Sequence, residues 1–297
     1  MATEQGVLKK TKSLTRVRMV FSISTVFILL LMAAVPNRVD AYVLEGPHVL
    51  DLSAKAMGRI AALQVEQKLL VYPQSPETLP TVFDETAIYV MPERFRSDIA
   101  SERIQRTFLV FADSSLTVID GRTVVGENPF DIYQRLLRSR TRPRLIRTLN
   151  QMGVETAISS LGRLEERVVF VLGARYPDES VSQLAIDKET FLPARLLLVD
   201  GDAEDGGRRL EIVYENWQKV QSGWFPFQVQ FYVNGRLARE IRVADLRINP
   251  SIPSSLMDLE SLKASVAENN AATPQGQKQE AVEEVQQAVE DFQKKFE

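Results

Sequence analysis

The fold of this 297-residue chain is decided by one stretch, which runs Val229-Gln230-Phe231-Tyr232-Val233-Asn234-Gly235-Arg236-Leu237-Ala238-Arg239-Glu240-Ile241-Arg242-Val243. Apolar and polar side chains alternate on both sides of Asn234-Gly235, which is the pattern of half-buried β-strands. An Asn-Gly pair between two such runs is a strong signal for a two-residue hairpin turn. The stretch therefore predicts two antiparallel strands that share one apolar face.

The alternation extends outward over the whole of Gln183–Pro250. No candidate catalytic group lies on the apolar face of this region. The open question is whether that face covers only the protein's own helices or a ligand as well. We expect strands at Gln183–Asp187, Pro193–Val199, Arg208–Trp217 and Trp224–Ile248, the last folded back at Asn234-Gly235.

Further strands and a few helices are predicted upstream of this region. Helices are expected at Gly46–Ile60 and over Pro129–Gly153, where apolar residues recur at spacings of three and four. Such a set of elements predicts an α+β fold: a large curved antiparallel sheet, an incomplete β-barrel of about eleven strands, wrapped around a few helices. The upstream strands are expected at Leu63–Tyr72, Thr86–Met91, Glu93–Ile99, Arg103–Ala112, Ser115–Asp120, Thr123–Val125, Val154–Leu164 and Arg167–Tyr176.

The N-terminal residues carry the pattern of an export signal. Basic residues precede the uncharged apolar run Met19–Val35, and small residues occupy both recognition positions of Val39-Asp40-Ala41. This order is typical of a secretory signal peptide, here residues 1–41. Because the apolar run approaches the roughly 20 residues that span a bilayer, an uncleaved inner-membrane anchor is the alternative. Either way, the rest of the chain is expected in the periplasm.

The sheet pattern stops after Pro250, and the chain is expected to continue in two further parts. The main domain is predicted to cover residues 42–259. Residues 260–276 are rich in Ala, Asn and Ser and indicate a linker. Residues 277–297 predict a polar helix with valines and phenylalanines at heptad-like spacing. That helix could dock on the domain, pair with another chain, or form a partially ordered tail.

Composition and motifs exclude several classes of function. The chain has no cysteine, which excludes disulfides and thiolate chemistry, and a single histidine, His48. No phosphate loop, dinucleotide fingerprint, nucleophile elbow or zinc-protease motif is present. The acidic loop Asp200–Gly207 superficially resembles a calcium loop, but Asp205 stands where such a loop needs glycine. We therefore predict a non-enzymatic protein without a metal or other cofactor.

Charge patterning also bears on the partners of the protein. The net charge of −3 leaves no domain-wide positive excess, so a nucleic-acid partner is not expected. Arginines nevertheless gather in the helical region, where solvated helix faces are the simplest interpretation and contact with an anionic headgroup is the alternative. These residues are Arg135, Arg138, Arg140, Arg142, Arg144 and Arg147.

The order of elements and a set of short segments carry a family resemblance. The segments are Val43–Leu52, Leu69–Tyr72, Ser160–Arg163, Leu184–Pro193 and Gly223–Pro226. Together they resemble the periplasmic outer-membrane lipoprotein carrier (LolA/LolB-like) superfamily over residues 42–259. The resemblance implies a half-closed sheet around helices, with an apolar cavity for acyl chains. The superfamily also includes sensor-type regulators of envelope stress. The helix after Pro274 departs from the carrier pattern, and no carrier's cavity arginine matches a position here.

These observations lead to two functional hypotheses. The first is a periplasmic carrier or binding protein for lipoprotein acyl chains or another lipid, active in outer-membrane lipoprotein sorting. It follows from the small number of helices, which would leave an apolar cavity on the concave side of the sheet. The second is an envelope regulatory or sensor protein that binds protein partners through the sheet or the C-terminal helix. The cavity is expected to be lined by Val71, Tyr89, Phe108, Phe170, Tyr214 and Phe231.

Overall fold

A computed structural model describes residues 43–272 of the chain, apart from 76–77, 103, 127 and 202–206. The predicted leader, the helix over 277–297 and most of the acidic loop lie outside the described residues. What we expect of those segments stays a prediction. No helix within the described part of the chain is both long and apolar enough to cross a membrane.

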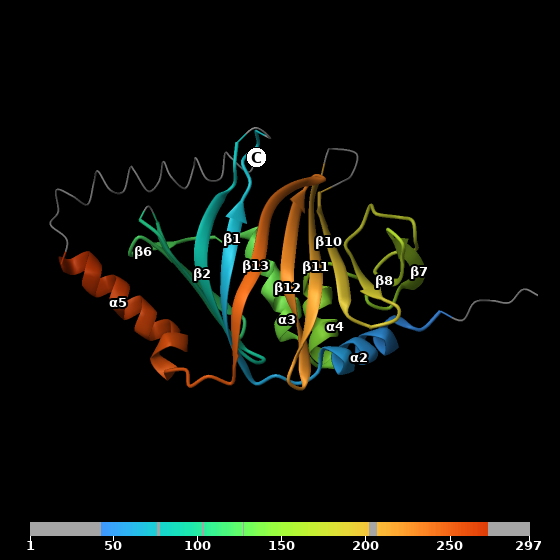
Figure 1. Ribbon diagram of the computed structural model, residues 1–297, viewed down its shortest axis with the longest axis horizontal. Helices are drawn as coiled ribbons and strands as arrows, with labels where there is room; N and C mark the ends of the chain where they lie inside the picture. The colour runs from blue at the N-terminus through green and yellow to red at the C-terminus, as the bar shows by residue number, and fades with distance from the viewer. Residues whose placement is uncertain (1–42, 76–77, 103, 127, 202–206, 273–297) are drawn as a thin grey trace, which may run out of the picture. The chain divides into compact units, whose positions relative to one another are not determined.

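Thirteen strands form one antiparallel sheet in the described residues (Figure 1). The large antiparallel sheet is therefore confirmed, although the count exceeds the expected number of about eleven. One reason is that 224–248, expected as one folded-back strand, forms two full strands. The strands are β1 (Ala62–Val71), β2 (Thr81–Val90), β3 (Arg94–Ala100), β4 (Gln105–Phe111), β5 (Ser114–Ile119), β6 (Arg122–Val124), β7 (Ser159–Leu164), β8 (Arg167–Leu172), β9 (Gln183–Asp187), β10 (Pro193–Asp200), β11 (Arg208–Val220), β12 (Gly223–Val233) and β13 (Arg236–Ile248).

The strand order places the first and last strands together in the middle of the sheet. It runs β6-β5-β4-β3-β2-β1-β13-β12-β11-β10-β9-β8-β7. The chain thus starts at the centre, moves strand by strand to the β6 edge, crosses to the β7 edge, and returns to the centre. The segment that crosses is the helical region between β6 and β7.

Two hairpin turns explain why neighbouring strands pair in sequence order. At Asn234-Gly235, between β12 and β13, both residues have positive φ, 48° and 78°. At Asp120-Gly121, between β5 and β6, the values are 48° and 75°. A type I′ turn needs positive φ at both central residues, and Gly adopts it without a Cβ clash. The hairpin predicted at Asn234-Gly235 is confirmed, and Asp120-Gly121 forms a second one between β5 and β6.

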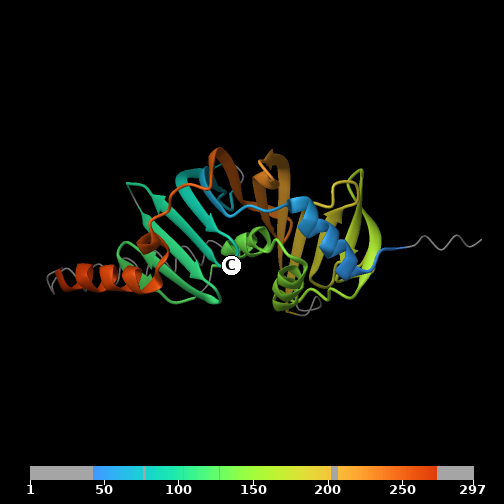
Figure 2. The same cartoon turned by 90° about the horizontal axis from the view of Figure 1, so that it is seen from below.

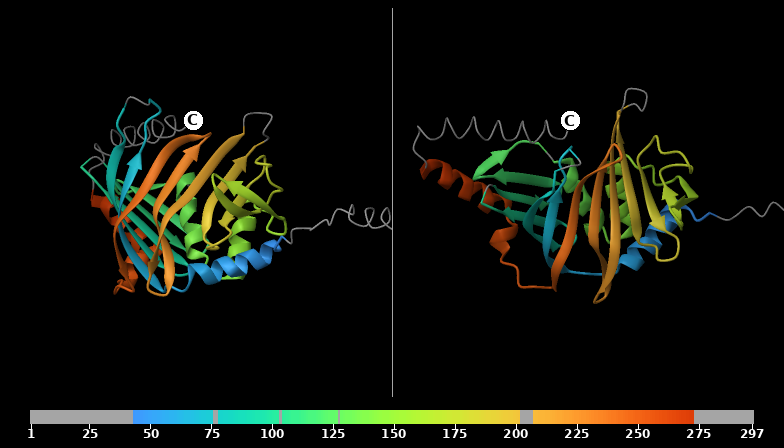
Figure 3. Two further views of the ribbon diagram at one scale, coloured as in Figure 1. Left: turned by 45° about the vertical axis from the view of Figure 1, so that its right-hand side comes forward. Right: turned by 45° about the horizontal axis from the view of Figure 1, so that its top comes forward.

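The crossing segment lies within the curve of the sheet, as Figure 2 shows from below. It consists of the 3₁₀ helix η1 (Pro129–Ile132) and the helices α3 (Tyr133–Arg138) and α4 (Arg142–Gln151), here called the helical cover. Asn128 caps η1, because its side-chain oxygen accepts a hydrogen bond from the Phe130 N–H at 3.0 Å. Helix α2 (Gly46–Met57) packs against α4 and β12 (Figure 3).

The C-terminal side of the domain differs from the predicted linker. After η3 (Ser254–Met257), residues Leu259–Ala272 form helix α5, which packs against β4, β5 and β6. Leu259, Leu262 and Val266 are spaced by three and four, so they share one helix face, and they pack on Leu116 and Val118 of β5. Composition alone suggested a linker because most of the remaining side chains in this helix are small or polar.

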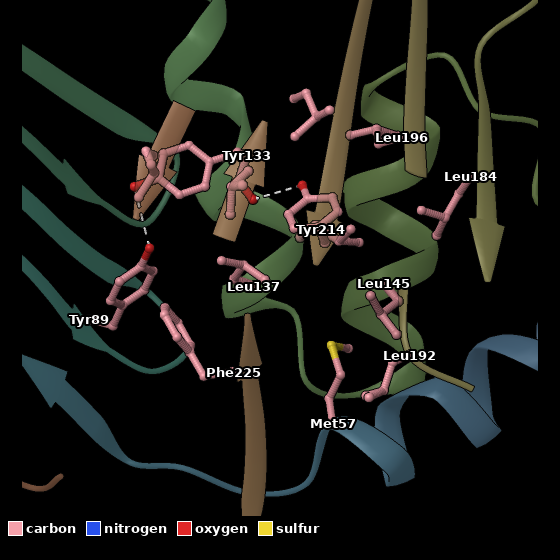
Figure 4. Packing of buried hydrophobic residues seen from close by; sticks show 14 of the residues in the cluster. Met57, Tyr89, Tyr133, Leu137, Leu145, Leu184, Leu192, Leu196, Tyr214 and Phe225 are labelled. Atoms are coloured by element: carbon pink, nitrogen blue, oxygen red, sulfur yellow. Dashed lines mark hydrogen bonds between the residues drawn. The ribbon is translucent and has the colours of Figure 1, made fainter. Parts of the chain in front are cut away.

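The main core lies between the helical cover, α2 and the side of the sheet that faces them (Figure 4). On that side apolar residues from strands throughout the sheet meet Leu50 and Met57 of α2, and Leu136, Leu137 and Leu145 of the cover. All five of these helical side chains are fully buried. The curved sheet is thus filled by tightly packed side chains along its centre.

Candidate functional site

The six predicted cavity residues all lie on the side of the sheet that faces the helices. Five of them are at most 4% exposed, and Val71 is half-buried at the end of β1. The alternation that predicted the face is therefore correct. Whether these side chains line a lipid cavity stays a prediction, since in this structure the five pack directly against other core residues.

Three tyrosines join the sheet to the helical cover. Tyr133 of α3 lies between Tyr89 of β2 and Tyr214 of β11, as Figure 4 shows. The Tyr214 hydroxyl donates to the Tyr133 carbonyl oxygen at 3.2 Å, and the Tyr89 and Tyr133 hydroxyls are 3.5 Å apart. Burial raises the pKa of all three phenols, so each stays protonated and remains a hydrogen-bond donor at neutral pH.

Aromatic rings make up the rest of this contact layer. Tyr133 meets Phe231 edge to face with centroids 5.6 Å apart, and Phe130 meets Phe231 at 5.8 Å. Phe95 of β3 contacts both Tyr89 and Tyr133 in the same geometry. Nearer the β7 edge of the same face, Phe170 of β8 stacks on Phe191. The cover therefore touches the sheet mainly through apolar side chains.

A polar cluster interrupts the apolar face next to this layer. Glu85 of β2 is almost fully buried and accepts hydrogen bonds from Ser97 Oγ and from Gln67 Nε2, the latter at 2.8 Å. Burial raises the pKa of this carboxyl above its usual range. Asp131 of η1 forms an ion pair with Arg106 of β4 close by. The apolar face predicted from alternation thus carries titratable groups at its centre.

Two arginines of the cover are buried, contrary to the expectation that all six lie on solvated helix faces. Arg140 donates to the carbonyl oxygens of Met57 at 2.6 Å, Trp224 at 3.1 Å and Leu137 at 3.1 Å. Its guanidinium therefore joins the ends of α2 and α3 to β12. Burial lowers the pKa of Arg140 to about 10, and the group stays charged at neutral pH. This is a structural role, since all three acceptors belong to the backbone of the protein itself.

Arg138 is the second buried arginine, and it lines a cleft. The cleft has a volume of about 350 Å³ and lies between the β4–β5 hairpin and the helices η1, α3 and α4. Its arginines are Arg135 and Arg138 on α3 and Arg144 and Arg147 on α4. On each helix the two arginines are three residues apart, so they share one helix face. We call this the arginine cleft. Phe108 is the one predicted cavity residue that lines it.

The arginine cleft could have been suspected from the sequence. Its arginines form a group in the sequence, and contact with an anionic headgroup is one of the two interpretations of that group. What local patterns could not provide is the approach of the β4–β5 hairpin, which closes the opposite side. His48, the single histidine, is exposed on α2 and does not line the arginine cleft. Among the described residues, no three His, Cys, Asp or Glu side chains gather closely enough to hold a metal ion.

The open sheet curved around helices is the fold that the LolA-like resemblance implies. Known structures similar to the chain include a LolA superfamily protein from Nitrosomonas europaea, with 12% identity, a TM-score of 0.49, and coverage of 73% of this chain and 99% of that one. A domain assigned to outer membrane lipoprotein sorting, from Vibrio parahaemolyticus, has 9% identity, a TM-score of 0.49, and coverage of 73% and 98%.

A more distant likeness is to the MucA/MucB complex of Pseudomonas aeruginosa, with 12% identity, a TM-score of 0.23, and coverage of 73% of this chain and 62% of that one. No family model matches the chain, and no curated protein matches it in sequence. At such low identities and TM-scores, no shared family or activity follows from these similarities.

Proposed function

We propose that this is a periplasmic, non-enzymatic carrier that holds acyl chains of a lipoprotein or another lipid between its sheet and its helical cover. The observation that supports the proposal is the contact layer between the two. It is built from rings and aliphatic side chains, and Phe130 and Tyr133 of the cover rest on Phe231. Apolar contacts are not directional, so an acyl chain could replace the ring and aliphatic contacts of the layer. The hydrogen bonds that would have to be given up there are the two that Tyr133 makes with Tyr214 and Tyr89.

Polar contacts on either side of α3 fit such a role. Asp131 is paired with Arg106 near the start of the cover, and Arg140 is held by three carbonyls between α3 and α4. Between these anchors the cover depends mainly on apolar packing. A lipid entering there would shift α3 while η1 and the junction between α3 and α4 stay attached. The six predicted lining residues keep their proposed role in that lipid-bound state.

The direct test is native mass spectrometry of protein produced in the periplasm. We expect co-purified lipid, released on denaturation and identified as acyl-chain species. Hydrogen exchange should then show faster exchange in α3, residues 133–138, with lipid bound than after lipid removal. Protein that is uniformly lipid-free and takes up no fluorescent fatty acid would overturn the proposal.

A matched pair of variants tests the face that is used. Val71, at the end of β1, faces the helices, whereas Val82 of β2 pairs with Leu70 and lies on the opposite face. Val71→Lys places a charge at the mouth of the proposed cavity and should lower lipid uptake several-fold, because an ammonium is costly to bury. Val82→Lys, an exposed position, should leave uptake unchanged. Equal effects of the two variants would contradict binding on the helix-facing side.

A further inference from the structure

The arginine cleft differs in chemistry from the aromatic contact layer and needs an explanation of its own. Three carboxylates line it beside its four arginines: Glu93, Asp113 and Asp131. Glu93 pairs with Arg144 at 2.8 Å, and Asp131 pairs with Arg106. The lining holds four arginines against three carboxylates. The lining of the cleft is therefore positive overall.

Arg138 is the most unusual member of the cleft. It is 8% exposed, and its hydrogen bonds within the described residues go to neutral acceptors. Its Nε donates to Gln134 Oε1 at 2.6 Å, and its Nη1 reaches the Pro92 carbonyl at 3.4 Å. A buried guanidinium is normally paired with a negative charge, because desolvation of an unpaired charge is costly. Burial, and then the like charge of Arg135, lower the pKa of Arg138 to about 10.

The remaining lining residues indicate what kind of anion would fit. Ser114, Ser115 and Thr148 supply hydroxyl groups, and the arginines supply forked N–H donors that suit tetrahedral oxyanions. An apolar part of the lining is formed by Phe108, Val110, Pro129 and Ile132. The volume of about 350 Å³ is within the usual range for small-molecule sites. The lining thus combines oxyanion donors with adjoining apolar surface.

We propose that the arginine cleft is a binding site for a phosphate group, carried either by the headgroup of an anionic lipid or by a soluble phosphate. Arg138 and Arg147 contact the phosphate from α3 and α4, and the hydroxyls of the β4–β5 hairpin complete its shell. The site goes beyond the proposed carrier function and does not depend on it, since inorganic phosphate has no acyl chain.

The test is isothermal titration calorimetry of the exported protein in phosphate-free buffer. The probes are inorganic phosphate, dihexanoyl phosphatidylglycerol, and dihexanoyl phosphatidylcholine, which has the same chains and no net charge. Arg147 is exposed, so Arg147→Gln should fold normally, and it should lower affinity about tenfold. The matched control is Arg142→Gln, which removes an exposed arginine from the same helix outside the cleft. It should leave affinity unchanged.

Each outcome decides the proposal. Binding of inorganic phosphate that Arg147→Gln weakens supports the site with a soluble anion as ligand. Binding of the phosphatidylglycerol alone, weakened in the same way, supports the site with a lipid headgroup as ligand. The proposal is overturned if neither anion binds, or if Arg147→Gln weakens anion binding no more than Arg142→Gln does. Lipid uptake by the aromatic layer could still occur in those cases, so the two proposals fail separately.

Discussion

Arg140 shows how one side chain can hold together segments that are distant in sequence. Its three acceptors belong to α2, to α3 and to β12, and each carbonyl stands at or near the end of its element. Orphan carbonyls at helix ends need partners when water is excluded. A guanidinium can serve several of them at once because it has five N–H donors.

Replacing Arg140 should therefore destabilise the domain strongly. Arg140→Met keeps the length of the side chain but leaves three carbonyls without their donor. We expect the free energy of unfolding to fall by about 3 kcal/mol, because the bonds are charge-assisted and buried. Urea denaturation measures the change, with Arg142→Met as the exposed control on α4. A loss no larger than that of the control would show that water can replace the guanidinium.

Glu85 gives a prediction about pH. Burial raises its pKa in the folded protein above the ordinary value of 4.5, so the folded state holds this proton more tightly than the unfolded state. The stabilisation is complete below that ordinary value and is lost as pH rises through the folded pKa. Glu85→Gln keeps the shape and cannot ionise. Its stability relative to the native protein should therefore be greater at about pH 8 than at about pH 4.

The measurement is urea denaturation of both proteins across this pH range. The comparison of the two proteins cancels the titration of groups that do not interact with Glu85. Glu189→Gln, at an exposed turn, serves as the control and should show no pH-dependent difference. A difference between native protein and Glu85→Gln that is constant with pH would mean that Glu85 is already charged and well solvated.

At the scale of elements, helix α5 protects the outer face of one sheet edge. Leu116 and Val118 of β5 point away from the main core and are covered by Val266. Without that cover, apolar surface on strands near the edge would face water, which favours association between chains. The helix thus belongs to the folded domain, although its sequence lacks the strong apolar stripe of α2 or α4.

Val266→Asp should release this contact. Loss of a buried valine side chain costs about 2 kcal/mol, and here the loss should remain local to α5, β5 and β6. We expect amides of β5 and β6 to exchange hydrogen faster while those of β11 and β12 are unchanged. Ala264→Asp, exposed on the same helix, is the control. Uniformly faster exchange throughout the sheet would indicate instead that α5 supports the whole domain.

The sequence could predict those helices, strands and turns that are determined by local residue patterns. The hairpins at Asp120-Gly121 and Asn234-Gly235, the strands and α2 follow from period-two or three-to-four spacing and from turn chemistry. The burial of Arg138 and Arg140 depends on carbonyls contributed by distant segments, so no local pattern encodes it. Alternation also placed Tyr214 and Phe231 on the correct face of the sheet. It could not show whether they pack in the core or line a cavity, because that depends on the distant segments that cover them. The packing of α5 was missed because a contact with β5 decides it.

At the scale of the whole molecule, the second hypothesis concerns the chain beyond the described domain. Residues 277–297 predict a helix with a heptad-like stripe, which could recruit an envelope protein. If so, deleting Gln277–Glu297 should abolish the capture of that partner in a pull-down from envelope extracts, and lipid uptake should be retained. The Val71→Lys variant should keep the capture of the partner and lose lipid uptake. Capture that is unchanged by the deletion would exclude this helix as the interaction site.

The central pairing of β1 with β13 has a mechanical consequence. Leu63, at the start of β1, is paired with Ile248, at the end of β13, so the chain enters and leaves the sheet at the same end of one strand pair. A force applied to the two ends of the chain, once α2 and α5 have detached, would therefore separate these strands one hydrogen-bonded pair at a time. Two strands that are pulled from opposite ends resist the force with many hydrogen bonds at once. β1 and β13 are pulled from the same end, so only one hydrogen-bonded pair resists the force at a time. The domain should accordingly unzip at low force, starting from its centre.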